Sequence, residues 1–211
     1  PQDDDNDAIN FVYVWMVNGS VIPVTNDMLD GTYFDKGDTV QCQLSPFDGL
    51  EIGNTVTSSA VTIQNSAPSI GSAIINPQNP SAADTLLCGY SDFIDPDDDA
   101  SQSLFEWTVN GAPAGNNPSL SGGFGYGDVV VCTITPSDGE DNGVSVSTSV
   151  LIENTPPVLS SVDITPTEPL EGDTLYCSPG TITDIDGTTS FTYTYSWEIN
   201  GLPHSNVSAA M

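Results

Sequence analysis

Closely spaced aspartates are the residues of this chain whose type and spacing could do chemistry. The segment Asp95-Pro96-Asp97-Asp98-Asp99 places carboxylates at alternate positions, and similar segments lie near both ends of the chain. Alternate carboxylates in a loop can converge on one hard cation such as calcium, which takes six to eight oxygen ligands. The glycine that an EF-hand loop needs at its sixth position is absent, so the spacing does not by itself identify the cation. The candidate calcium ligands are Asp95, Asp97, Asp99, Asp138, Asp141, Asp3, Asp5, Asp7, Asp184 and Asp186.

The charge balance leaves two roles open for these aspartates. The chain has 29 acidic residues against a single basic one, Lys36, and its formal net charge is −28. One lysine cannot organise the chain through salt bridges, so repulsion between carboxylates is relieved by spacing, by screening or by bound cations. The aspartates therefore either bind calcium or form a solvated acidic surface, since Asp also suits turn geometry.

Several function classes are excluded by composition. Nucleic-acid phosphates need Lys and Arg, and an anionic membrane surface would repel this chain. No apolar run is long enough for a membrane helix, and no signal segment opens the chain. With one histidine, His204, and no phosphate-loop lysine, we expect no enzyme. Glycoside hydrolysis by paired carboxylates would need a cleft lined by aromatics, whereas the tryptophans are expected in the core.

The elements that position the acidic loops repeat along the chain. Tryptophans that open a segment ending in Asn-Gly, and cysteines in matching contexts, recur about every 90 residues. These recurring residues are Trp15, Trp107 and Trp197, Cys42 and Cys132, and Cys88 and Cys177. We predict a partial repeat at 1–66 that lacks its first strands, a complete repeat at 67–155, and a partial repeat at 156–211 that lacks its last strands. The chain is then a window onto a longer tandem array.

Within each repeat, apolar and polar residues alternate with the period of half-buried strands. The segments 105–109 and 193–199 each place aromatic and aliphatic side chains on one face. Leu86, Cys88 and Tyr90 alternate in the same way, which puts Cys88 on an inward face. No segment shows a helical stripe of apolar residues, so the sequence predicts an all-β fold.

The complete repeat resembles the immunoglobulin-like β-sandwich, in which a Trp packs on a disulfide between two sheets. The resemblance rests on Cys88, Trp107 and Cys132, in that order, on three alternating strands. The Asp-rich loop, the strand and Trp-x-Val-Asn-Gly also resemble the polycystic-kidney-disease-type repeats of microbial extracellular surface proteins. The resemblance covers essentially the whole chain and departs at the tyrosine corner, where Val130 stands. It implies tandem Ig-like sandwiches of about 90 residues each.

The resemblance implies a disulfide between Cys88 and Cys132, and partners outside the chain for Cys42 and Cys177. In the chain-entropy model such a bond stabilises the repeat by about 3–4 kcal/mol. The alternative is buried free thiols; a metal site is disfavoured because no CxxC spacing exists. A disulfide implies an oxidising compartment, so we expect an extracellular or cell-surface location.

The function implied by the resemblance is structural or adhesive: a stalk, an adhesin or a component of an extracellular filament. Its partners would be further repeats, other copies in a filament, or a cell-surface or carbohydrate target. In an Ig-like unit the loops holding Asp95 and Asp138 share one end, so calcium bound there would stiffen the joints between repeats. The alternative is a binding or spacer module attached to a secreted hydrolase.

Overall fold

The computed structural model describes residues 8–204, and within them the chain is all-β, as predicted. Strands and one short 3-10 turn, η1 (Gly31–Tyr33), make up the regular structure of this range, and no α-helix occurs in it. Within this range, no helix has the length and apolar character needed to cross a membrane. Contacts divide the chain into two compact units. The first is Pro1–Ser72, Tyr90–Leu104 and Ile134–Val146; the second is Ala73–Gly89, Phe105–Thr133 and Ser147–Met211.

The first five strands form one sheet in the order β2-β1-β3-β4, with β5 also pairing to β3. Their bounds are β1 (Asn10–Val17), β2 (Ser20–Ile22), β3 (Thr39–Phe47), β4 (Val56–Thr57) and β5 (Val61–Thr62). β1 and β2 are antiparallel and joined by a tight turn in which Asn18 and Gly19 have φ of 50° and 77°. Asn and Gly are the residues that tolerate this left-handed conformation, which explains the Asn-Gly pair after each Trp strand.

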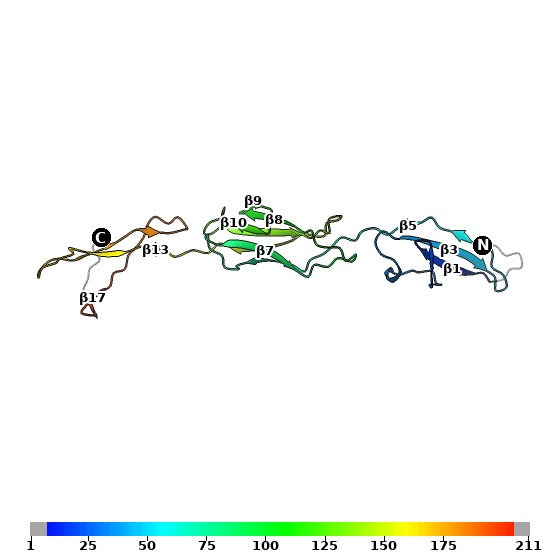
Figure 1. The fold of residues 1–211 in the computed structure, drawn as a ribbon, viewed down its shortest axis with the longest axis horizontal. Coiled ribbons are helices and arrows are strands. Elements are labelled where there is room, and N and C mark those ends of the chain that lie inside the picture. Colours follow the sequence, from blue (N-terminus) through cyan, green and yellow to red (C-terminus); the bar gives the residue numbers. More distant parts are fainter. Residues whose placement is uncertain (1–7, 205–211) are drawn as a thin grey trace. The chain divides into compact units, whose positions relative to one another are not determined.

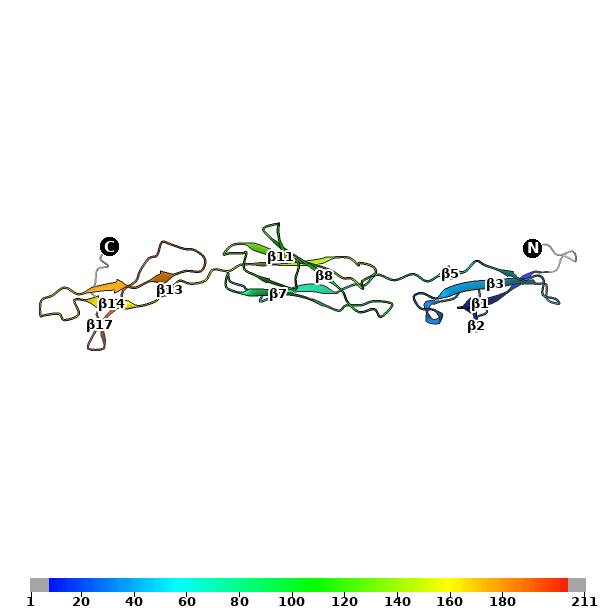
Figure 2. The ribbon, with the colours of Figure 1, turned by 45° about the horizontal axis from the view of Figure 1, so that its top comes forward.

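The middle of the chain forms two sheets. A three-stranded sheet has the order β10-β7-β6 and a four-stranded sheet the order β12-β11-β8-β9. The bounds are β6 (Ser72–Asn76), β7 (Thr85–Ser91), β8 (Leu104–Val109), β9 (Ala112–Gly115), β10 (Ser119–Ser121), β11 (Val129–Thr135) and β12 (Val146–Leu151). Figures 1 and 2 show β7 and β8 in separate layers. This arrangement is consistent with a β-sandwich.

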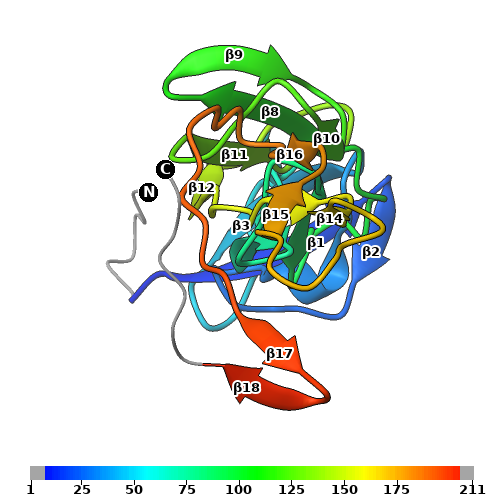
Figure 3. The same cartoon turned by 90° about the vertical axis from the view of Figure 1, so that its left-hand side faces the viewer.

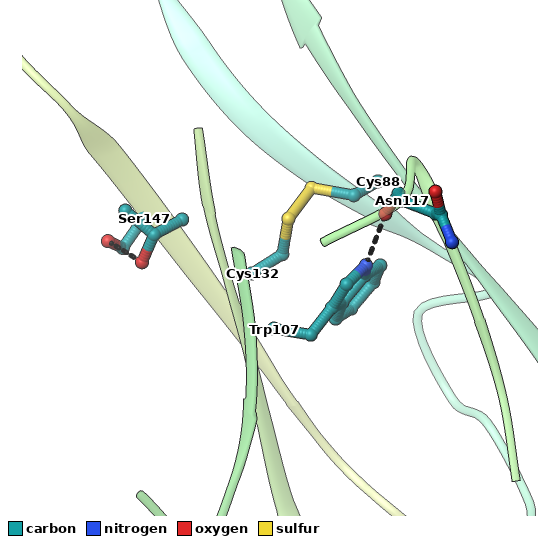
Figure 4. The surroundings of a disulfide bond; sticks show 6 residues. Cys88, Trp107, Asn117, Cys132 and Ser147 are labelled. Atoms are coloured by element: carbon teal, nitrogen blue, oxygen red, sulfur yellow. Dashed lines mark hydrogen bonds between the residues drawn. A yellow bond between two sulfur atoms is a disulfide. The ribbon is translucent and has the colours of Figure 1, made fainter. Parts of the chain in front are cut away.

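The core of the second unit lies between these layers. Its buried apolar side chains come from both sheets and from the turns beside them: Ile75, Leu86, Cys88, Trp107, Leu120, Phe124, Val130, Cys132 and Ile152. A disulfide joins Cys88 of β7 to Cys132 of β11 with Cα atoms 6.4 Å apart. Trp107 is fully buried beside it, and its Nε1 donates to the Asn117 carbonyl at 2.8 Å (Figure 4). The disulfide implied by the resemblance is therefore present.

After Pro157 the strands form three antiparallel pairs, β13 with β16, β14 with β15, and β17 with β18. Figure 3 shows β17 and β18 side by side. Their bounds are β13 (Val158–Leu159), β14 (Val162–Thr165), β15 (Tyr176–Pro179), β16 (Ile182–Thr183), β17 (Trp197–Ile199) and β18 (Leu202–His204). The inward face predicted over 193–199 is not formed: only 197–199 is a strand, and Tyr193 and Tyr195 are exposed. Each pair is two strands wide, and so narrow a sheet cannot bury an apolar face.

Hydrogen bonds recur at the spacing of the predicted repeats. Asn18 Oδ1 accepts from the Thr39 amide at 2.9 Å, and Asn110 Oδ1 accepts from the Val129 amide at 3.0 Å. In both places the Asn Nδ2 donates to an aspartate, Asp38 or Asp128. The repetition in sequence thus corresponds to repeated local structure, while the limits of the repeats themselves stay a prediction.

Candidate cation-binding site

The loop between β7 and β8 brings three carboxylates together. Asp95, Asp97 and Asp99 each offer an oxygen that lies within 4.8 Å of the other two. Asp95 is buried, and its Oδ1 accepts from the amides of Asp97 at 2.8 Å and Asp99 at 3.4 Å. The loop therefore folds around the Asp95 side chain, which explains how alternate residues converge. A set of three carboxylates could hold a metal ion; the geometry alone does not select which.

The segment 65–67 after β5, which we call the first linker, connects this loop to a second acidic turn in the same unit. The matching segment 154–156 is the second linker. Asn65 Nδ2 donates to Asp138 Oδ2 at 2.8 Å and to Asp141 Oδ2 at 2.9 Å. The next residue, Ser66, donates its amide to Asp97 Oδ2 at 2.6 Å. Asp138 and Asp141 thus lie at the predicted end of the fold but bind an amide rather than joining the three-carboxylate cluster. We call Asn65, Ser66, the loop 95–99 and the turn 138–141 the first junction.

Asp138 is the carboxyl of the first junction whose pKa is lowered. It is buried, and its Oδ1 accepts from the amides of Glu140 and Asp141, both at 2.7 Å. The Asn65 side-chain amide and then the Asp141 backbone amide stabilise its ionised form and lower its pKa to about 2. Asp138 therefore stays ionised while buried, and the hydrogen bond that it accepts from Asn65 holds the turn 138–141 against the first linker.

Lys36 forms a local pair of salt bridges beside the first junction. Its Nζ lies 2.7 Å from Asp99 Oδ2 and 2.6 Å from Glu140 Oε1, so the single lysine connects the two acidic segments of the first junction. Both carboxylates raise the Lys36 pKa above its ordinary value. One lysine still does not organise the whole chain, but here it meets two carboxylates at once.

The residues after the first linker pack tightly against the same turn. Pro68 is fully buried, and a Cβ added at Gly143 would meet the Pro68 backbone carbonyl oxygen. Only a glycine allows this close approach, because a backbone atom cannot swing aside. The first junction is therefore held by close packing as well as by hydrogen bonds.

A similar contact occurs in the other compact unit. Thr155 donates its amide to Asp186 Oδ2 at 2.5 Å, and Asp186 donates its own amide to Asp184 Oδ1 at 2.8 Å. These two bonds reproduce those of Ser66, Asp97 and Asp95. We call Thr155 and the loop 184–188 the second junction. The remaining candidate ligands, Asp3, Asp5 and Asp7, lie outside the residues that the structure describes.

Sequence reasoning missed the roles of two residues: Asn65 of the first junction, and Lys36, which pairs with both of its acidic segments. Each carried a signal. Lys36 is the only basic residue of the chain and directly precedes a repeated Gly-Asp, whereas Tyr126 stands at the matching place. Asn65 recurs as Asn154 in the next linker. Neither feature of the sequence identifies the carboxylates that Lys36 and Asn65 contact, because those residues lie far away in the sequence.

The two cysteines outside the disulfide are half-buried thiols on β3 and β15. Burial raises the pKa of the Cys42 thiol, which lowers its reactivity. No family model matches this chain, and no curated protein matches it.

Proposed function

We propose that this chain is a structural or adhesive segment of a secreted or cell-surface protein built from tandem immunoglobulin-like sandwiches, with calcium stiffening the contacts between linkers and acidic loops. One observation carries the proposal: the same linker-to-loop hydrogen bond is made twice. Ser66 binds Asp97 and Thr155 binds Asp186, each across 31 positions in sequence. A contact that recurs at a fixed interval is typical of a tandem array and is not typical of a catalytic site.

The disulfide and the buried indole support the immunoglobulin-like part of the proposal. Cys88 and Cys132 bridge the two layers of the sandwich, and Trp107 packs beside the bridge in its core. This is the arrangement expected of Ig-like domains. A disulfide of this kind persists in an oxidising environment, which supports a location outside the cell.

The donor set supports calcium as the cation. Asp95, Asp97 and Asp99 offer only carboxylate oxygens, which are hard ligands. Calcium accepts six to eight oxygens in variable geometry, whereas magnesium demands near-ideal octahedral geometry, so a loop of clustered carboxylates suits calcium better. Because Asp97 also holds the Ser66 amide, a cation on the cluster would fix the loop to which the linker is bonded. The rotation of one segment about the next would then be restricted.

The location and role can be tested on native material. Antibodies raised against this chain would label intact cells of the source, followed by immunogold electron microscopy. Gold on tethers or filaments outside the cell is the expected result. Gold seen only after permeabilisation, or antigen recovered solely with a secreted hydrolase, would overturn the structural role.

The stiffening can be tested on the chain itself. Small-angle X-ray scattering in millimolar calcium and in chelator would compare the spread of conformations. Calcium should narrow the distribution of distances within the chain, and magnesium at the same concentration should do so less. Identical scattering with calcium and with chelator would remove calcium from the proposal while leaving the array intact.

A further inference from the structure

Unpartnered oxygens gather at the two junctions. Among the side chains described between residues 8 and 204, four buried oxygen atoms have no hydrogen-bond partner: Asn65 Oδ1, Asp95 Oδ2, Thr155 Oγ1 and Asp186 Oδ1. All four belong to a linker or to the acidic loop that the linker contacts. A buried oxygen without a partner costs about 1–3 kcal/mol, so each such atom calls for an explanation, of which a bound ion is one.

The oxygen of Asp95 gives the three-carboxylate cluster an independent indication of a ligand. Asp95 is 9% exposed, and its two carboxylate oxygens have different surroundings. Oδ1 accepts the backbone amides that shape the loop, whereas Oδ2 is buried and has no donor. A charged oxygen buried without a donor is stabilised by a cation more effectively than by any neutral group.

Asn65 presents the second such oxygen at the same junction. Its Nδ2 is fully used by Asp138 and Asp141, which fixes the orientation of the amide. Its Oδ1 is buried and unpartnered, one residue from the amide that Asp97 binds. An amide oxygen is a hard, neutral ligand of the kind that calcium accepts alongside carboxylates.

We infer that Asn65 Oδ1 is a ligand of the cation held by Asp95, Asp97 and Asp99, so that one calcium ion binds the linker and the loop together. The inference rests on the proposed function, since it takes calcium to be the cation of this cluster. The three carboxylates and one amide oxygen leave room for water in a shell of six to eight oxygens. The cation then acts as part of the joint rather than as a stabiliser of the loop alone.

The second linker supplies a matched control within the same chain. Asn154 stands at the place of Asn65, but it is exposed, and at the place of Asp99 the second loop has Thr188. Asn154 is therefore not expected to hold a cation in the way that Asn65 does. The two asparagines differ in surroundings while sharing residue type and position in the repeat.

The test is a calcium titration of the full chain followed by NMR at the Asp97 amide, which reports on the first junction alone. Asn65→Ala should weaken calcium binding there by about 10–100-fold, the range seen when a group that orients or completes a site is removed. Asn65→Asp, which keeps an oxygen but loses the donor to Asp138 and Asp141, should retain more calcium affinity than Asn65→Ala. Asn154→Ala should leave the titration at Asp97 unchanged.

Each result separates the inference from the proposed function. If calcium does not shift the Asp97 amide of the native chain, the calcium element of the proposed function fails and the inference fails with it. If the native chain binds calcium and Asn65→Ala binds equally well, only the inference fails, and Asn65 Oδ1 binds at most a water molecule. If Ala and Asp weaken binding equally, Asn65 acts through its donated hydrogen bonds, which also overturns the inference. Circular dichroism of each variant confirms that it folds.

Discussion

The two junctions share one geometry but differ in charge. At the first junction, the Ser66 amide donates a hydrogen bond to a loop with carboxylates at 95, 97 and 99. Lys36 forms ion pairs with Asp99 of this loop and with Glu140 of the neighbouring acidic turn. At the second, Thr155 is bonded to a loop in which position 188 is a threonine. The backbone hydrogen bond thus sets the shape of the contact, and the charged side chains around it can vary. We expect the charge content to set how strongly each junction responds to cations, salt and pH.

The first junction concentrates acidic groups that repel one another. Hydrogen bonds and an ion pair reduce the repulsion between these carboxylates. The Asn65 side-chain amide donates to Asp138 and Asp141. The Ser66 backbone amide donates to Asp97, and Lys36 forms an ion pair with Asp99. Asp95 Oδ2 is buried and has no hydrogen-bond partner. The second junction has fewer carboxylates and less repulsion to relieve, so it depends less on counterions.

Removing the central carboxylate should have the largest effect. Asp95→Asn keeps an oxygen for the loop amides but removes a charged cation ligand, so calcium affinity at the first junction should fall about 100-fold, because affinity follows the charge count of the ligands. The measurement is the NMR titration at the Asp97 amide. Asp184→Asn, the matched change in the other loop, should leave that titration unaffected. An equal loss from both variants would show that the two junctions do not act separately.

A glycine beside the first junction tests the packing rather than the charge. Gly143→Ala forces a Cβ against the Pro68 carbonyl and should destabilise that region by about 1–3 kcal/mol, as overpacking generally does. Gly53→Ala is the control, because its Cβ would meet the side-chain ring of Pro46 at 2.8 Å, while the Pro46 carbonyl oxygen lies at an ordinary 3.6 Å. Hydrogen exchange at the Gly143 and Ser66 amides measures the difference. Equal protection in both variants would mean that the linker is not held by this contact.

The sequence predicted the parts of this molecule that depend on local pattern. Alternation predicted an all-β chain, and the spacing of Asp95, Asp97 and Asp99 predicted their convergence, because both follow from neighbouring residues. It also predicted a buried face at Tyr193 and Tyr195, which the structure leaves exposed. Burial needs a second layer against the strand, and alternation in one segment carries no information about that layer.

Long-range partners were the part that the sequence could not supply. Lys36 lies 63 positions from Asp99 and 104 from Glu140, so its role depends on how distant segments meet. Asn65 lies 73 positions from Asp138. A single basic residue in an acidic chain has many candidate partners, and charge alone does not choose among them.

Acid should weaken the first junction through Asp138. Its pKa in the folded chain is about 2, below the ordinary 3.8, so the ionised form stabilises the fold above about pH 4, and that stability is lost as pH falls from about 4 to 2. Asn65→Ala removes the largest cause and should raise the Asp138 pKa toward 3.8. Asp48 is the control, since backbone amides and no Asn side chain lower its pKa. NMR titration of both carboxyls measures the shifts, and an unchanged Asp138 pKa in Asn65→Ala would contradict this explanation.

Lys36 should have the smallest effect and an opposite sign. Its Nζ forms an ion pair with Asp99 Oδ2, and Asp99 is one of the three carboxylates of the cluster. Calcium must therefore compete with the lysine ammonium for Asp99. Lys36→Gln frees Asp99 and should raise calcium affinity at the first junction about threefold, a modest change because both side chains are partly exposed and screened. Tyr126→Gln changes the matching position, where the side chain is exposed, and should alter nothing.

The sign of the Lys36 effect distinguishes competition from support. If Lys36 held the loop in the shape that calcium needs, Lys36→Gln would weaken binding, and added salt would weaken the native chain in the same way. If it competes, salt should reduce the difference between the native chain and Lys36→Gln, because screening weakens the ion pair that calcium must replace. Without calcium, the same lysine connects the two acidic segments. At the first junction, calcium and the Lys36 ammonium would then replace each other on Asp99. The second junction has Tyr126 at the position of the lysine, and none of its described residues supplies a cationic side chain.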